Sequence, residues 1–320
     1  MATIRDIAQL SGVSIATISR ALNKPDTVSP ETLQLVLQYV DELNYQLKRK
    51  TKKMTNLFGV ILPNITNPFF MELLEVLENE SYLHGRSILF FNSKQNARQE
   101  LIALHECEAH GVDGVFLTPV GDLNRQYQQK INQYRFQTVI LTRSATALPS
   151  VAVDHEYGGR MSAAHLVSLG HSEVGYIGFL SPHDEKFTGF SRYLEEQGQP
   201  LKSDHIFDIS QNRTLPEFIR HIVQVKHVTA IGCENDVLAR RIVDTVREMS
   251  DISEDQLTLV GFDNSLISKL LHFSSIAQPM REMAHLGFES MLQALKTPIQ
   301  TEYQPQLLLP RLVVRNTLLN

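Results

Sequence analysis

The alternation of short apolar runs with amphipathic stretches of helical period, from Leu57 onward, constrains the fold most strongly. The apolar runs are continuous, as expected for parallel strands covered on both faces. The expected strands are Leu57–Leu62, Ser87–Phe91, Gly114–Leu117, Thr138–Leu141, Val174–Phe179, Ala230–Cys233 and Leu257–Phe262. The expected helices are Met71–His84, Ala97–His110, Gly158–Leu169, Phe187–Gln197, Leu215–Val225 and Asp236–Met249. The pattern therefore predicts an α/β body of doubly wound parallel sheets.

The same scaffold serves nucleotide-dependent enzymes, but the usual catalytic signatures do not occur. No G-x-G-x-x-G follows the first strand, and the chain contains no G-x-x-x-x-G-K-[ST], G-x-S-x-G or H-E-x-x-H sequence. Cys107 and Cys233 lie far apart, so we expect two buried thiols rather than a disulfide or a zinc cluster. The 12 histidines are scattered. We therefore expect no enzyme activity, no cofactor and no metal site.

Composition and charge distribution limit the classes of protein to which the chain can belong. The chain has 320 residues, 42% apolar and 20% charged, without an apolar run long enough to span a membrane or a secretory signal. These features predict a soluble cytoplasmic protein. Its net charge of −5 is unevenly distributed. Residues 1–56 contain eight Lys/Arg against five Asp/Glu, and five of those cations fall within residues 48–53. This basic segment on an acidic body suggests a polyanionic partner for the N-terminal region.

The first 45 residues have the spacing of a compact three-helix unit. Ile4 begins the first expected helix, Gly12 ends it, and a second runs from Ile15 to Leu22. Ser29-Pro30-Glu31 supplies a cap, an N1 proline and an early acid for a third helix. Its expected buried stripe is Leu33, Val36, Leu37, Val40 and Leu43. The short turn between the first two helices predicts a helix-turn-helix, although a helix pair alone also fits the core of a larger helical domain.

A helix-turn-helix directs the start of its second helix at the DNA major groove. Ile15, Ala16, Ser19 and Arg20 should then face outward. Arg20 can form a forked contact with a guanine, and Ile15 and Ala16 suit a thymine methyl group. Ser14, Thr17 and Asn23 are better placed for phosphate contacts.

The N-terminal region closely resembles the headpiece of the lactose repressor (LacI/GalR) family. The match includes the V-S-x-x-T-[VI]-S-R run at Val13–Arg20, then Asn23, the stretch from Val28 and the pair Asn44-Tyr45. The resemblance implies a hinge segment at residues 46–56 that inserts an apolar wedge, here Met54, into the minor groove.

The hinge departs from the family pattern in two ways. Leu47 stands where a proline is common, and a lysine run replaces the usual small and mixed residues. We expect Lys50 and Lys53 to contact DNA phosphates and to make binding unusually sensitive to salt. The alternative is that this run is only a solvated linker.

The body also resembles that family, in G-V-I-L-P-N-I-T-N-P-F-F from Gly59, V-A-V-D-H-E-Y-G-G-R from Val151 and V-G-F-D-N from Val260. The resemblance implies a periplasmic-binding-protein-like pair of lobes, with chain crossings near residues 155, 280 and 307. The expected N-lobe is residues 57–155 with 280–307, and the expected C-lobe is residues 156–279 with 308–320, which together form the effector-binding and dimerisation core 57–320.

Ligands bind beyond the carboxyl ends of the strands in such sheets. The expected effector-binding residues at these ends are Phe69, Phe70, Thr118, Lys186, Asn235, Asp236 and Asp263. The family usually has an arginine where this chain has Lys186, and the loss of its planar fork leaves the effector open. Phe69 and Phe70 are alternatively core residues at a helix start, and Asp263 alternatively caps a turn.

The resemblance implies a cytoplasmic, nucleoid-associated repressor of a carbohydrate operon, controlled by a sugar or sugar phosphate. The alternative is a regulator responsive to a purine or nucleoside. The expected partners are operator DNA, that effector and a second copy of the chain, without a membrane. A homodimer is expected because no leucine heptads follow the closing strand Leu312–Arg315. The rivals are a sugar-binding uptake receptor, which lacks a headpiece, and an enzyme on the same scaffold.

Overall fold

The computed structural model describes residues 4–23, 28–43, 54–180, 184–210, 214–297 and 302–315. The chain divides into two compact units, Met1–Met54 and Thr55–Asn320.

The first unit contains three helices, α1 (Ile4–Ser11), α2 (Ile15–Asn23) and α3 (Pro30–Glu42). Gly12 lies at φ +70° and donates its N–H to the carbonyl of Ala8 at 3.1 Å, which ends α1. The hydroxyl of Ser14 accepts the N–H of Thr17 at 3.1 Å and caps α2. The buried centre of this unit is Ile7, Ile18, Ala21 and Val36.

Leu37 of α3 was expected to face this centre but is 46% exposed. Three short helices enclose a narrow core that is filled from one stripe of each helix. An apolar residue at the edge of that stripe therefore remains in water, and the prediction for Leu37 was too broad.

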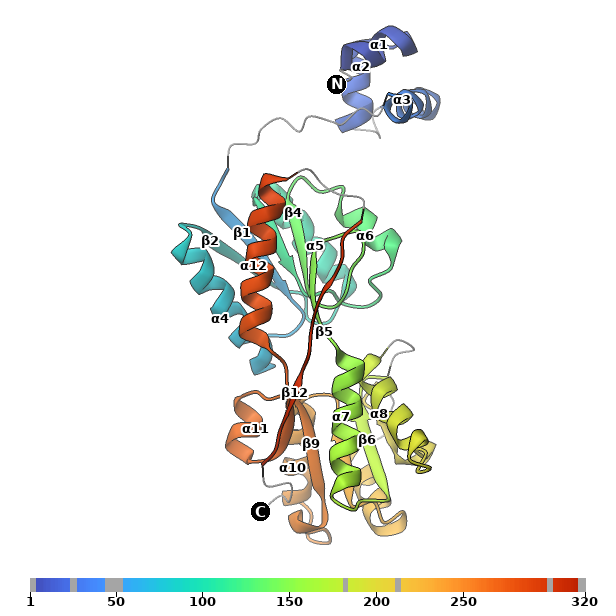
Figure 1. Cartoon of the computed structure of the whole chain (residues 1–320), viewed down its shortest axis with the longest axis vertical. Helices are drawn as coiled ribbons and strands as arrows, with labels where there is room; N and C mark the ends of the chain where they lie inside the picture. The colour runs from blue at the N-terminus through green and yellow to red at the C-terminus, as the bar shows by residue number, and fades with distance from the viewer. Residues whose placement is uncertain are drawn as a thin grey trace. The chain divides into compact units, whose positions relative to one another are not determined.

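The second unit is built on two six-stranded sheets (Figure 1). The first sheet has the order β11-β5-β4-β3-β1-β2, and all its pairs are parallel. Its strands are β1 (Leu57–Leu62), β2 (Ser87–Asn92), β3 (Gly114–Leu117), β4 (Gln137–Thr142), β5 (Ser150–Val153) and β11 (Gln306–Leu308). Its helices are α4 (Pro68–Leu83), α5 (Ala97–Ala109), α6 (Arg125–Ile131) and α12 (Met280–Lys296).

Alternate residues of the strands pack on opposite faces of this sheet. Phe58 and Val60 lie in one buried cluster with residues of α4 and α12, which cover one face (Figure 1). Ile61 and Val115 lie in another cluster with residues of α5 and α6. Both faces are therefore buried, which explains why the strands read as continuous apolar runs.

The second sheet has the order β12-β10-β9-β8-β6-β7. Its strands are β6 (Val174–Gly178), β7 (Ile206–Asp208), β8 (Ala230–Cys233), β9 (Thr258–Asp263), β10 (Ser274–Ala277) and β12 (Arg311–Val313). Its helices are α7 (His155–Ser168), α8 (Glu185–Glu196), α9 (Leu215–Arg220), α10 (Asp236–Arg247) and α11 (Leu266–Leu271), with a π-helical turn at His221–Val225 after α9. Strand β12 is antiparallel to β10, and the other pairs are parallel. The predicted α/β fold class is confirmed, with one antiparallel edge strand added.

The chain passes between the sheets after β5, between β10 and α12, and between β11 and β12. Because nearly all strands of each sheet run in parallel, the carboxyl ends of most of them lie along one edge. The two thiols are buried in different apolar clusters, as expected, with Cys107 against the first sheet and Cys233 against the second.

Helices α7 and α8 approach each other through two glycines. A Cβ atom on Gly159 would collide with the carbonyl of Lys186, and one on Gly189 would collide with the carbonyl of Glu156. Only glycine permits this approach, which holds α8 and its first turn against α7.

Candidate nucleic-acid interface and ligand cavity

The beginning of α2 presents the outward surface that the sequence predicted. Ile15 is 46% exposed, and Ala16 and Arg20 are exposed as well. Ser19 and Thr17 are half-buried. The guanidinium Nε of Arg20 donates to the carbonyl of Ala16 at 3.4 Å, so this side chain lies along the exposed side of the helix. The apolar side chain of Ile15 suits contact with a thymine methyl group, and the guanidinium of Arg20 suits contact with a guanine edge.

Part of the predicted DNA-binding set lies outside the described residues. This applies to Lys50, Lys53 and the side chain of Asn23. Met54, the predicted wedge, is 45% exposed.

The first residues of the second unit are held by one buried carboxylate. Asp113 accepts the N–H of Thr55 at 3.0 Å and the N–H of Asn56 at 2.9 Å. Arg86 forms a salt bridge with the same carboxylate at 3.2 Å. Asp113 therefore fixes the point at which the chain enters the body.

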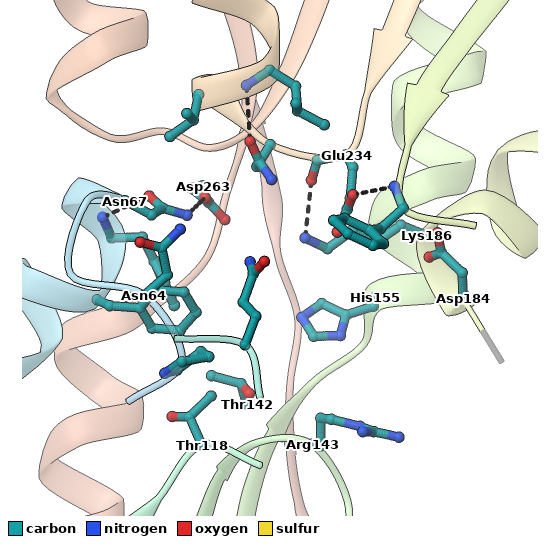
Figure 2. Close-up of a pocket in the computed structure, with 18 of the residues that line it drawn as sticks. Asn64, Asn67, Thr118, Thr142, Arg143, His155, Asp184, Lys186, Glu234 and Asp263 are labelled. Atoms are coloured by element: carbon teal, nitrogen blue, oxygen red, sulfur yellow. Dashed lines mark hydrogen bonds between the residues drawn. The ribbon is translucent and has the colours of Figure 1, made fainter. Parts of the chain in front are cut away.

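A cavity of about 890 Å³ lies between the two sheets, and both contribute to its lining (Figure 2). Phe69, Phe70 and Thr118 line it from the first sheet's side, and Lys186, Asn235 and Asp263 from the second. The structure thus brings together six of the seven predicted effector residues. Phe69 is 4% exposed and also belongs to the core beside α4, so its core and cavity-lining interpretations both hold.

Asp263 joins the two sides of this cavity. Its carboxylate accepts a hydrogen bond from the amide of Asn67 at 3.0 Å (Figure 2). It also accepts one from the amide of Gln278 at 2.7 Å. Burial raises the pKa of Asp263, while the Lys186 ammonium and these two amides act in the opposite direction. Its backbone has φ +102°, a strained conformation for a residue with a side chain.

Lys186 lies in the first turn of α8, whose N-cap Asp184 accepts the N–H of Phe187 at 3.2 Å. The Lys186 ammonium donates to the main-chain carbonyl of Glu234 at 3.0 Å (Figure 2) and lies 4.0 Å from the centre of the Phe262 ring. These contacts orient the ammonium at the cavity wall.

Asp236 does not line the cavity, which corrects the prediction for this residue. Its side chain is 0% exposed and accepts hydrogen bonds from Ser265 and Ser275. Burial raises the pKa of Asp236 to about 7, and the neighbouring Asp263 adds to this effect. As the first residue of α10, Asp236 turns back toward β9 and β10 instead of into the cavity.

Several cavity residues were missed by sequence reasoning. Asn64 and Asn67 follow β1, Thr142 ends β4, and Glu234 precedes the predicted Asn235. All four lie at or after the end of a strand, so the rule that ligands bind beyond strand ends could have identified them. His155 and Gln278 instead lie on segments that cross between the sheets, where strand patterns give no signal.

No group of three or more His, Cys, Asp or Glu side chains is arranged for a metal ion within the described ranges. In the same part of the chain, no helix is long and apolar enough to cross a membrane.

A helix-turn-helix unit and a two-sheet body with an internal cavity define a DNA-binding regulator of the periplasmic-binding-protein-like type. Residues 3–47 match the sequence model for bacterial regulatory proteins of the lacI family. Residues 55–256 match the model for periplasmic binding proteins and the sugar-binding domain of the LacI family. Since these matches cover more than half of the chain, it belongs to the lacI family of transcription regulators, and the resemblance seen in the sequence is confirmed.

Individual relatives cover nearly the whole chain. The ribose operon repressor of Halalkalibacterium halodurans is 29% identical over 99% of this chain and 97% of its own. The transcriptional repressor PurR of Photobacterium profundum is 26% identical over 92% of each. The lac repressor dimer bound to operator and the anti-inducer ONPF superposes with a TM-score of 0.68, at 22% identity over 99% of this chain and 98% of that one. Curated relatives of this kind are transcription regulators.

Proposed function

We propose that the protein binds operator DNA as a homodimer in the cytoplasm and represses genes for the uptake or catabolism of a carbohydrate. The main observation behind this proposal is the cavity between the two sheets. Residues from both sheets line it, and the Asn67–Asp263 hydrogen bond bridges it. A ligand there contacts both lobes at once, so its binding is coupled to the arrangement of the lobes. The cavity binds its ligand without transforming it.

The proposed DNA contacts follow from the exposed start of α2 and the lysine run. Ile15, Ala16 and Arg20 read bases, with Ser19 beside them. Phosphate contacts come from Ser14, Thr17, Asn23, Lys50 and Lys53, and Met54 acts as the minor-groove wedge. The hinge at residues 46–56 transmits the change in the lobes to this surface.

A sugar is proposed as the effector because amide and carboxyl groups line the same cavity as Phe69 and Phe70. Such groups bind hydroxyls, and an aromatic face packs against a sugar ring. The relation to the ribose operon repressor supports this proposal. A purine is the second candidate, because the ring of Phe179 lines the cavity and is 48% exposed, which suits stacking on a base. The relation to PurR supports that alternative.

Exposed apolar residues on α4 and α11 support the homodimer. Tyr82 and Leu83 of α4 are 76% and 75% exposed, and Leu266 and Leu270 of α11 are 53% and 68% exposed. A two-fold operator needs two headpieces at a fixed spacing, which a dimer supplies. The relative whose structure was solved on its operator is likewise a dimer.

Gel-shift titration with DNA from upstream of the protein's own gene tests the function. We expect a specific shift that changes on addition of a sugar, a sugar phosphate or a purine. The absence of any specific shift, with and without these compounds, would contradict the proposal.

A further inference from the structure

Three carboxyl groups form one wall of the cavity, and we call them the acidic subsite: Asp184, Glu234 and Asp263 (Figure 2). Each lies beyond or at the end of a strand of the second sheet, since Asp184 precedes α8, Glu234 follows β8 and Asp263 ends β9. Their convergence was not evident in the sequence, where they are separated by tens of residues.

The acidic subsite has fewer positive than negative charges. Lys186 is the one ammonium among its neighbours in the described chain, and it donates to the main-chain carbonyl of Glu234 rather than to a carboxylate. Among the described residues, none of the three carboxylates has a cation within 4.0 Å. His155, at the edge of the group, pairs with Glu185 at 3.5 Å.

The pKa shifts of the three carboxyl groups agree with this excess of negative over positive charge. Burial raises the pKa of Asp184, Glu234 and Asp263, and Asp184 and Asp263 raise that of Glu234 further. The Lys186 ammonium opposes this effect at all three groups, hydrogen bonds oppose it at each, and His155 opposes it at Asp184 and Asp263. A second cation would relieve the mutual repulsion of the three groups.

Polar atoms without partners line the same cavity. Oδ2 of Asp184 is buried and has no hydrogen-bond partner in the described structure, because the N-cap bond uses Oδ1. Across the cavity, the hydroxyl of Thr118 is also unpartnered, and this residue is 4% exposed. A bound molecule that donates hydrogen bonds on one side and offers hydroxyls on the other would satisfy both.

Two arginines, Arg143 and Arg241, also line the cavity. Arg143 donates to the carbonyl of Gly121, and its electrostatic partners are Glu100 and Glu185. Arg241 is not among the charges that shift the pKa of the three carboxyl groups. The charge of Arg143 therefore acts on a different part of the cavity. Lys186 is the one cation that acts on all three carboxyl groups, so a phosphorylated sugar placed at the acidic subsite would meet an excess of negative charge, which is unfavourable.

We propose that the effector is an amino sugar whose protonated amine binds at the acidic subsite, with Glu234 as its main acceptor. Glu234 suits this role because only one of its carboxylate oxygens is engaged among the described contacts. That oxygen, Oε2, accepts the N–H of Phe179 at 2.6 Å. The ring hydroxyls bind Asn64, Thr118 and Asn235, which also line the cavity. This inference rests on the proposed sugar-responsive function and narrows its ligand class.

Isothermal titration of the full-length protein provides the test, with D-glucosamine, D-galactosamine, their neutral parents glucose and galactose, and glucose 6-phosphate as probes. One amino sugar should bind at least about tenfold more tightly than its neutral parent, as expected for one charge-assisted hydrogen bond. Glu234→Gln keeps an acceptor for Phe179 but removes the charge, and it should abolish this preference. Glu217→Gln, an exposed change of the same kind on α9, should leave the preference intact.

Two results would overturn the inference. One is tighter binding of a neutral or phosphorylated sugar than of both amino sugars, or no binding of either amino sugar. The other is an amine preference that survives in Glu234→Gln. A neutral sugar that changes the gel shift would leave the proposed regulatory function standing, whereas the loss of specific DNA binding would remove the proposed function itself.

Discussion

Asn67 offers the sharpest test of how the two lobes are connected. Its side-chain oxygen accepts the N–H of Phe69 at 3.0 Å and caps α4, and its amide donates to Asp263 at 3.0 Å. Asn67→Ala removes both interactions. Loss of the cap costs about 1 kcal/mol of stability. Loss of a hydrogen bond to a charged, buried acceptor costs about 1.5–3 kcal/mol. The body should therefore lose about 2.5–4 kcal/mol in total.

A serine at this position separates the two contributions. Asn67→Ser retains a hydroxyl that caps the helix but is too short to reach Asp263, so about 1.5–3 kcal/mol should still be lost. Asn96 provides the matched control, because it caps α5 through the N–H groups of Arg98 and Gln99 at 2.9 and 3.1 Å. Asn96→Ser should change the free energy of unfolding by only a few tenths of a kcal/mol.

Urea unfolding followed by far-UV circular dichroism measures these changes as shifts in the midpoint of the body's transition. The reasoning fails if Asn67→Ser is as mild as Asn96→Ser, because the bond between the lobes would then contribute nothing. It also fails if Asn67→Ala and Asn67→Ser are equally destabilised, because the helix cap would then have no effect.

Three further outcomes are expected. Gly189→Ala forces α8 away from α7 and should cost at least about 1–3 kcal/mol in a thermal melt, with weaker effector binding; normal stability would contradict the close approach. Because burial raises the pKa of Asp236 to about 7 in the folded state, its stabilising contribution is complete below about pH 4 and is lost as the pH rises to about 7. Asp236→Asn should therefore flatten the decrease in stability over that range, by at most about 4 kcal/mol, and an unchanged pH profile would argue against this assignment. Changing Lys50, Lys52 and Lys53 to Gln should reduce the slope of log affinity for operator against log salt by about 0.9 for each phosphate that is no longer neutralised, and an equal slope would show that the lysine run is only a linker.

The sequence was most informative where strands are buried on both faces. The observed bounds of β1, β3 and β8 are those expected, because their apolar runs are continuous and end at polar or turn residues. Helix α12 was not predicted. Its buried face includes Gly287, where a Cβ atom would lie 2.6 Å from the side chain of Leu141. Tertiary packing requires a glycine that local helix propensity disfavours.

The cavity was only partly predictable for a geometric reason. Glu234, Asn235 and Asp236 are consecutive, yet the first two line the cavity and the third is buried behind it. Their directions depend on the backbone of the cap, since Asn235 is extended at φ −156° and Asp236 begins the helix. Sequence spacing identifies such a loop but not the direction of each side chain. Asp263 was identified by its place after a strand, whereas its contact with Asn67 requires the fold.

The most direct test of the central claim compares DNA binding by the full-length chain with binding by a chain shortened to residues 55–320, on the same operator duplex. If α2 reads the bases and the body only modulates that contact, the shortened chain should lose specific affinity by a factor of about 1,000 or more. Equal affinity of the two chains for that duplex would contradict the account.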